Sequence, residues 1–310
     1  MKTILVIGGY GFIGTNILKY VEENFVDSYD IIVFDKFAKH PCGIECSRVI
    51  ASYEGDFSDA DVLERIFVEN KVDLVIHSLS TTIPSKSFNA VYDVETNLIP
   101  TLNLLRMMIS HGVRDIVYIS SGGAIYGESQ GGKHAETENP FPISSYGVVK
   151  LAVEKYMMQY SALYGLRPLI LRLSNPYGLY HYSMRQGICN VAMRKALENE
   201  TFEVWGDGQA RKDYIFVRDF VAIMFMLLKK DVAPKVINVG SGEAVSVNGI
   251  LGIIKNFVPE FEWRYADAMK LDVSHFELDT SLLKSIIGHY DFVSLDTGLS
   301  LTYNWAKTIC

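Results

Sequence analysis

The 310-residue chain has 49% hydrophobic and 21% charged residues, which is typical of globular proteins and excludes disordered and fibrous classes. Its formal net charge of −7 offers no basic surface for nucleic acid, and no run approaches the ~18 apolar residues of a membrane span. Four scattered cysteines (Cys42, Cys46, Cys189 and Cys310) form neither a disulfide framework nor a metal signature, so we expect reduced cytoplasmic thiols and no metal.

Short apolar runs alternate with helical patterns through the first half of the chain. Residues 3–7 form a continuous apolar run, which predicts a strand buried on both faces of a parallel sheet. Similar runs follow at 30–35, 72–77, 116–120 and 167–172, and helical spacing occurs at 59–70 and 94–111. This order predicts a Rossmann-like, doubly wound α/β sheet.

A glycine-rich turn follows the first predicted strand. It contains Gly8, Gly11 and Gly14, with Phe12 and Ile13 between the last two. Glycines at this spacing let the backbone approach a pyrophosphate, which the following helix N-terminus attracts. The turn therefore predicts a dinucleotide site.

An acidic residue, Asp35, ends the second predicted strand, about 20 residues after the turn. A carboxylate at this place binds the ribose 2′-hydroxyl and repels a 2′-phosphate, so it favours NAD over NADP. Lys36 directly beside it weakens that preference.

The helix predicted at 146–164 begins with Tyr146 and Lys150, four residues apart and therefore on one face. An ammonium beside a phenol stabilises the phenolate and lowers its pKa. Ser120 and Ser121 stand at the C-terminal end of a predicted strand, where α/β sheets place ligand chemistry. We expect Tyr146 to remove a hydroxyl proton while a hydride passes to nicotinamide.

The pattern changes after residue 174. Turns at 175–178 and 206–208 separate shorter, less regular elements, but 236–240 reads as another buried strand. We predict an NAD-binding Rossmann domain over 1–174 with a returning segment near 212–252. Residues 175–310 form mainly a smaller, interleaved α/β substrate-binding lobe, with a ligand cleft between the two.

Several motifs stand in a recognisable order: GGYGFIG at 8–14, SSGGAIYG at 120–127, SYGVVK at 145–150, RLSNPYG at 172–178 and WGDGQARKDY at 205–214. With them the chain resembles the extended short-chain dehydrogenases of the NAD-dependent sugar epimerase and dehydratase family, most closely the UDP-glucose 4-epimerases. The resemblance covers nearly the whole chain. It implies NAD as cofactor and a nucleotide sugar, a UDP-hexose above all, as substrate.

The resemblance also implies roles for individual residues. Asp56 and Phe57 would border the adenine, and Leu79 and Ser80 the cofactor diphosphate. Asn97 would support the main chain near the nicotinamide. The same implied cofactor site includes Ser120, Tyr146 and Lys150. The sugar nucleotide would contact Ser121, Tyr146, Asn175, Val204 and Trp205.

This chain departs from the family's pattern at three places. Gly122 stands where the family's catalytic serine or threonine usually lies, so Ser121 supplies the hydroxyl if one is used. Lys212, preceded by Arg211, replaces the arginine of an RDY motif, and Lys270 replaces a later arginine that binds diphosphate. Lysine neutralises phosphate as a point charge, without the fork geometry of arginine.

In the dehydratases of the family that the chain resembles, an acidic residue lies in the stretch that is 122–125 here. This chain has Gly-Gly-Ala-Ile there, so the resemblance disfavours dehydration. His181 lies in a nearby loop, where we expect it to face solvent. A phenolate, a lysine and a nicotinamide are enough for 4-epimerisation. Two alternatives stay open: a reductase of NDP-4-keto-6-deoxy sugars that uses NAD(P)H, and a non-catalytic NAD-binding regulator.

The helix predicted at 146–164 is apolar around more of its circumference than one sheet-facing stripe requires. This feature, together with the resemblance, predicts a homodimer formed through this helix and the helix at 94–111.

Overall fold

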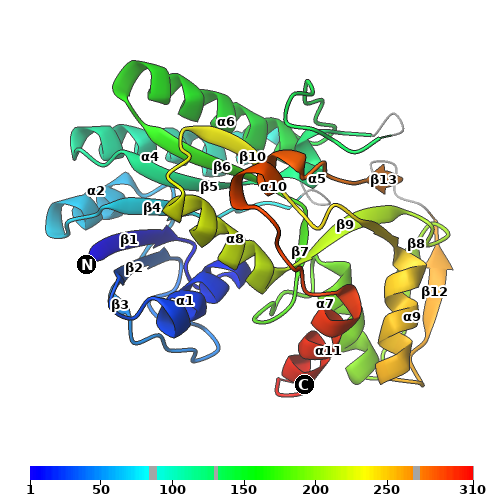
Figure 1. Cartoon of the computed structure of the whole chain (residues 1–310). Helices are drawn as coiled ribbons and strands as arrows, with labels where there is room; N and C mark the ends of the chain where they lie inside the picture. The colour runs from blue at the N-terminus through cyan, green and yellow to red at the C-terminus, as the bar shows by residue number, and fades with distance from the viewer. Residues whose placement is uncertain (84–88, 129–131, 268–272, 310) are drawn as a thin grey trace.

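A seven-stranded parallel sheet forms the centre of the protein (Figure 1). The computed structural model describes residues 1–83, 89–128, 132–267 and 273–309. In the spatial order β10-β6-β5-β4-β1-β2-β3, the strands are Lys235–Val239, Arg167–Leu173, Asp115–Ser121, Leu74–His77, Lys2–Ile7, Tyr29–Asp35 and Val49–Glu54. The predicted doubly wound α/β sheet is confirmed.

The sequence analysis missed strand β3 (Val49–Glu54). This strand lies at the sheet edge, and among its six residues only Tyr53 is buried. An edge strand needs no continuous apolar run, so its sequence lacks the pattern that marks the central strands.

Helices cover both faces of the sheet. On one face, α1 (Phe12–Asn24) packs against α8 (Val217–Lys229), with α10 (Ser281–Ile287) beside α8. On the other face lie α2 (Ala60–Glu69), α4 (Ile99–Ser110) and α6 (Ser145–Tyr164), side by side (Figure 1). None of the helices in the described ranges is long and apolar enough to cross a membrane.

The helix expected over 94–111 is interrupted. A short helix α3 (Ala90–Asp93) leads into a π-helical turn, Val94–Leu98, before α4 begins. Pro100 in the first turn of α4 has no N–H group to continue the preceding hydrogen-bond pattern, which accounts for a break near this position. The Thr101 hydroxyl donates to the Asn97 carbonyl at 2.6 Å and closes the turn. Such π turns are frequent at functional sites.

A second, smaller lobe is built from later segments. Its main sheet contains β7 (Asn175–Tyr177), β9 (Arg211–Phe216), β11 (Ala244–Ser246) and β13 (His275–Phe276). A second pair is β8 (Phe202–Trp205) with β12 (Trp263–Ala266), and the helices are α7 (Ile188–Leu197), α9 (Val247–Phe257) and α11 (Leu295–Ala306). Between these segments the chain returns to the large sheet as α8 and β10, so the two lobes are interleaved (Figure 1).

Close packing at the start of α1 depends on a glycine. A Cβ at Gly14 would lie 2.3 Å from the Gly8 carbonyl oxygen and 2.6 Å from the Gly9 Cα. Any side chain there would push the helix away from the turn that precedes it. By contrast, Gly252 in α9 is exposed and has open space around its Cα.

These two helical glycines form a matched pair for a stability measurement. We expect Gly14→Ala to lower the free energy of unfolding by about 1–3 kcal/mol through overpacking. Gly252→Ala should raise it by about 0.5–1 kcal/mol through helix propensity. Urea unfolding followed by circular dichroism measures both, and equal shifts in the same direction would contradict the packing argument.

Candidate active site

A cleft of about 1070 Å³ follows the C-terminal edge of the large sheet. It runs from Asp35 and Asp56 at one end to Trp205 and Lys212 of the smaller lobe at the other. Most residues predicted for the site line it: Gly8, Gly11, Phe12, Ile13, Gly14, Asp35, Lys36, Asp56, Phe57, Leu79, Ser80, Ser120, Ser121, Tyr146, Lys150, Asn175, Trp205 and Lys212.

The glycine turn offers unshared backbone donors to this cleft. Gly8 has a φ of +78°, and the Gly11 N–H donates to the Gly8 carbonyl at 3.2 Å. Helix α1 starts after Gly11, and no side chain caps its first turn. The leading N–H groups of a helix have no intrahelical partner, and together with the helix dipole they bind phosphate. The turn therefore fits a dinucleotide diphosphate.

The loop that follows β2 is connected to the glycine turn by hydrogen bonds. The Thr15 hydroxyl donates to the Gly11 carbonyl at 2.8 Å, and His40 Nε2 lies 3.0 Å from the same hydroxyl. The Cys42 N–H donates to His40 Nδ1 at 3.1 Å, which leaves Nε2 as the protonated nitrogen that donates to Thr15. A chain of hydrogen bonds thus links the loop to the turn.

Asp35 lies at the end of β2, where a ribose ring of a bound dinucleotide would reach it. Its side chain is only 7% exposed, and one carboxylate oxygen accepts the Tyr10 N–H at 3.0 Å. Burial raises the pKa of Asp35, and backbone hydrogen bonds oppose that rise. The Lys36 ammonium lies over the Phe37 ring, 4.9 Å from its centre.

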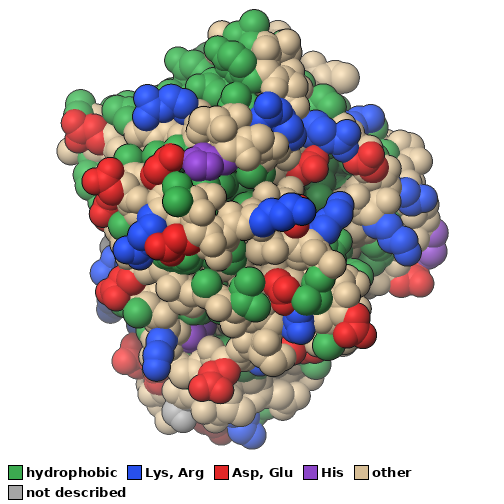
Figure 2. Space-filling model, turned by 90° about the vertical axis from the view of Figure 1, so that its left-hand side faces the viewer, with side chains coloured by type: hydrophobic (Ala, Val, Ile, Leu, Met, Phe, Trp, Pro, Cys, Tyr) green, Lys and Arg blue, Asp and Glu red, His purple; other side chains and the backbone are tan. Residues whose placement is uncertain are grey.

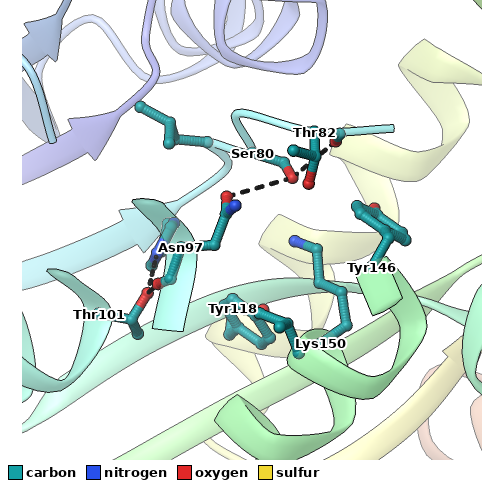
Figure 3. Close-up of a pocket in the computed structure, with 10 residues that line it drawn as sticks. Ser80, Thr82, Asn97, Thr101, Tyr118, Tyr146 and Lys150 are labelled. Atoms are coloured by element: carbon teal, nitrogen blue, oxygen red, sulfur yellow. Dashed lines mark hydrogen bonds between the residues drawn. The ribbon is translucent and has the colours of Figure 1, made fainter. Parts of the chain in front are cut away.

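Tyr146 and Lys150 project from the first turns of α6 toward the same space (Figure 3). Tyr146 is hydrogen-bonded to Ser121 at the end of β5. The Lys150 ammonium donates to the Ile119 carbonyl at 2.9 Å and lies 5.7 Å from the centre of the Tyr146 ring. The predicted triad of Ser121, Tyr146 and Lys150 is therefore brought together.

The presence of glycine at residue 122 has a steric explanation. A Cβ there would lie 3.0 Å from a methyl group of Leu278 and 3.2 Å from the Phe276 ring, both in the segment that closes on α5 (Gly122–Ile125). A serine or threonine would crowd these side chains. Ser121, one residue earlier, supplies the hydroxyl that contacts Tyr146.

Burial acts on the ionisation of both catalytic candidates. It raises the pKa of Tyr146 to about 12, which the Ser121 hydrogen bond opposes, and it lowers the pKa of Lys150 to about 8. At pH 7 the lysine is therefore mostly charged and the phenol neutral. Additional positive charge near the phenol would favour its ionisation.

Asn97 holds the loop that follows β4. Its side-chain oxygen accepts the Thr81 N–H at 2.9 Å, and its amide donates to the Thr81 hydroxyl at 2.7 Å. Ser80 lies next to it and donates to the Thr82 carbonyl at 3.0 Å (Figure 3). Asn97 and Lys150 line one small recess beside the cleft.

Two predicted substrate residues that the structure describes, Arg211 and Val204, are not among the residues that line the cleft. The Arg211 guanidinium donates to the Ala244 carbonyl at 2.5 Å and joins β9 to β11. The Val204 side chain is buried in the core of the smaller lobe. Lys270 lies outside the described residues.

The expectation for His181 is wrong. Its side chain is only 5% exposed and meets the Phe12 ring edge-on, with ring centres 4.6 Å apart. Burial lowers the pKa of His181 to about 4, so the ring is neutral at pH 7. The loop folds back because the Asn16 amide of α1 donates to the Leu179 carbonyl at 2.8 Å. Local sequence carries no sign of this long-range contact.

The cleft wall also includes Val273 and Phe276, which the sequence analysis missed. They come from a segment more than 100 residues beyond α6, and only the folding of the smaller lobe brings them to the site.

Comparison with known proteins places this geometry in a family. The sequence profile of the NAD dependent epimerase/dehydratase family matches residues 4–240. A Methanocaldococcus jannaschii protein, provisionally named a UDP-glucose 4-epimerase, is 32% identical over 98% of both chains.

Two solved structures superpose over almost the entire chain. The Thermotoga maritima UDP-glucose 4-epimerase with UDP-glucose has a TM-score of 0.91 and 31% identity, covering 99% of each chain. The Thermus thermophilus UDP-glucose 4-epimerase complex with NAD has a TM-score of 0.89 and 27% identity, covering 98% of this chain and 99% of that one. The chain, with its cleft for NAD, therefore belongs to the NAD-dependent epimerase/dehydratase family.

Proposed function

We propose that this protein is an NAD-dependent nucleotide-sugar 4-epimerase that inverts C4 of a UDP-hexose through a transient 4-keto sugar. The observation that carries the proposal is the grouping of Ser121, Tyr146 and Lys150 at a part of the cleft without a carboxylate. Among the described residues that line the cleft, the only acidic side chains are Asp35 and Asp56, at the end of the cleft away from the smaller lobe. Elimination of water would need an acid or base beside the neighbouring carbons, so proton transfer to Tyr146 alone fits best.

In this proposal Tyr146 accepts the proton of the C4 hydroxyl, Ser121 orients that hydroxyl, and Lys150 stabilises the phenolate. NAD, when bound, supplies the hydride acceptor. The glycine turn and Asp35 would hold the cofactor so that it takes up the hydride of C4 and returns it to the opposite face of the 4-keto sugar after that sugar has turned over. Tyr146 then gives the proton back, so the net redox change is zero.

The end of the cleft that lies in the smaller lobe offers contacts for the sugar nucleotide. Trp205 and Lys212 line it from the β8 and β9 region, and Asn175 lies where β7 begins. The lysine supplies positive charge suited to a diphosphate. The identity of the M. jannaschii relative and the fold of the T. maritima enzyme also support a UDP-hexose substrate.

The decisive experiment supplies UDP-glucose, UDP-galactose and their N-acetylamino forms without added reductant and follows the anomeric and H4 signals by proton NMR. We expect the C4 epimer to appear. Turnover only of 4-keto-6-deoxy sugars with NADH would instead support a reductase, which would use the same three side chains once per cycle.

Replacement of Tyr146 tests the catalytic assignment. We expect Tyr146→Phe to reduce kcat about 10²–10⁴-fold, because no other side chain takes the C4 proton, and to leave NAD affinity nearly unchanged. Tyr156→Phe on the exposed face of α6 is the matched control. Equal kcat values for both variants would refute the catalytic role of Tyr146, and NAD binding without any turnover in the wild type would point to a non-catalytic, NAD-binding protein.

Asp35 should determine cofactor preference. We expect Asp35→Ser to weaken NAD binding about tenfold or more through loss of a charged hydrogen bond to ribose, and to relax discrimination against NADP. Titration calorimetry with each cofactor measures the change. Asp27→Ser, at an exposed position in the loop before β2, provides the control. Unchanged NAD affinity in Asp35→Ser would remove this residue from the site.

We also propose that the protein forms a homodimer through α6 and α4. Val148, Tyr156 and Leu163 are exposed along α6, and Ile99 is exposed on α4. Figure 2 shows hydrophobic side chains gathered at the top of one face, where Figure 1 places the C-terminal end of α6, while charges of both signs are mixed elsewhere on that face. Exposed apolar side chains gathered in this way are typical of an interface.

Negative charges introduced by mutation on the exposed apolar face of α6 should separate the subunits. We expect Tyr156→Glu combined with Leu163→Glu to convert a dimer into a monomer in light scattering at micromolar concentration, because carboxylates would be buried unpaired. Tyr265→Glu, at an exposed position on β12, should leave the mass unchanged. A wild-type monomer at this concentration would refute the proposed dimer.

A further inference from the structure

A buried ion pair lies directly behind the catalytic lysine. Glu154 on α6 and Arg172 on β6 are 2% and 4% exposed. Arg172 Nη2 donates to Glu154 Oε2 at 2.8 Å, and Arg172 Nε lies 3.2 Å from both carboxylate oxygens. The Ser120 hydroxyl donates to Glu154 Oε1 at 2.5 Å. Within the described part of the chain, the hydrogen bonds to this carboxylate come from one buried guanidinium and one buried hydroxyl.

The pair is aligned with Lys150 by the secondary structure. Glu154 follows Lys150 by four residues, so both side chains leave α6 on the face that packs on the sheet. Lys150 reaches the carbonyl of Ile119, and Glu154 reaches the next residue, Ser120. Ser120 is in turn paired in register with Arg172 across β5 and β6. From the cleft inward, the groups follow in the order Tyr146 phenol, Lys150 ammonium, Glu154 carboxylate and Arg172 guanidinium.

Further contacts hold the guanidinium on the far side of the carboxylate. Arg172 Nη1 donates to the Tyr126 hydroxyl at 2.8 Å, and the guanidinium carbon lies 5.0 Å from the centre of that ring. The Tyr126 hydroxyl donates to the Asn238 side chain at 2.8 Å, and Asn238 donates to the His134 carbonyl at 2.8 Å. Arg172 is thus tied to β10 and cannot turn toward Lys150.

Glu154 is the buried carboxylate whose charge acts on Lys150. Burial lowers the pKa of Lys150, and Glu154 opposes that effect. The other ionisable side chains come from neighbouring elements: His77 of β4, Tyr118 of β5, Arg172 of β6 and Asp93 of α3, which packs against α6. Burial keeps His77 neutral, with a pKa of about 3, and raises the pKa of Tyr118, so neither supplies charge at neutral pH.

Packing alone does not require charges here, because well-packed apolar side chains of similar volume commonly stabilise a core as well as a buried ion pair does. We propose that Glu154, oriented by Arg172, is a positioning residue that keeps the Lys150 ammonium charged and beside Tyr146. This inference rests on the catalytic roles proposed for Tyr146 and Lys150. It assigns a function to two buried residues that are not among the residues lining the cleft.

Ionisation of Lys150 is the measurement. The protein is labelled with isotopically enriched lysine and titrated with pH by NMR, and the Lys150 signal is assigned with Lys150→Met. We expect Glu154→Gln to lower the pKa of Lys150 by about one unit, because burial remains while the opposing carboxylate charge is lost. Glu154→Asp retains the carboxylate and should give a smaller shift.

A double variant is the control in case the single variants unfold. Glu154→Leu with Arg172→Met leaves no unpaired charge, so it should remain folded by circular dichroism and still lower the pKa of Lys150. A folded double variant with the wild-type Lys150 pKa would overturn the proposal and leave the pair a packing role. The pKa measurement needs no sugar substrate. If the expected pKa shift is found but the protein has no 4-epimerase activity, the proposed function is rejected while the positioning role of Glu154 stands.

Discussion

Parallel pairing of the strands in the large sheet determines where most candidate residues of the large lobe lie. Strands β1, β2, β4, β5 and β6 all end at one edge of the sheet, and the residues that follow them meet in one cleft. Gly8 follows β1, Asp35 ends β2, and Ser121 ends β5. Residues more than 100 positions apart thus contribute to one site because their strands share a direction.

Burial determines how readily the two ionisable side chains of the site can carry charge. The low-dielectric surroundings disfavour charge on both Tyr146 and Lys150. Ser121 opposes this effect at the phenol, and Glu154 opposes it at the ammonium. The counter-charge of Glu154 is carried by Arg172, so the protein places a charge near the lysine while leaving the buried pair itself neutral.

The smaller lobe contributes shape more than charge near Tyr146 and Lys150. Phe276 and Leu278 lie so close to Gly122 that a Cβ there would meet them at 3.0–3.2 Å, and the hydroxyl next along the chain belongs to Ser121. The same segment brings Val273 and Phe276 onto the cleft wall. The shape of this part of the cleft therefore depends on β13.

The sequence by itself determined the parts that depend on neighbours along the chain. The glycine turn, Asp35 at the end of β2, and Tyr146 with Lys150 one helical turn apart are local patterns, and the structure brings them to one cleft. Tertiary structure alone decided that β3 joins the sheet edge, that Arg211 turns to Ala244, and that His181 packs on Phe12. It also joined Glu154 to Arg172 across α6 and β6. Each of these depends on contacts between distant segments, and neither hydrophobic periodicity nor residue spacing records such contacts.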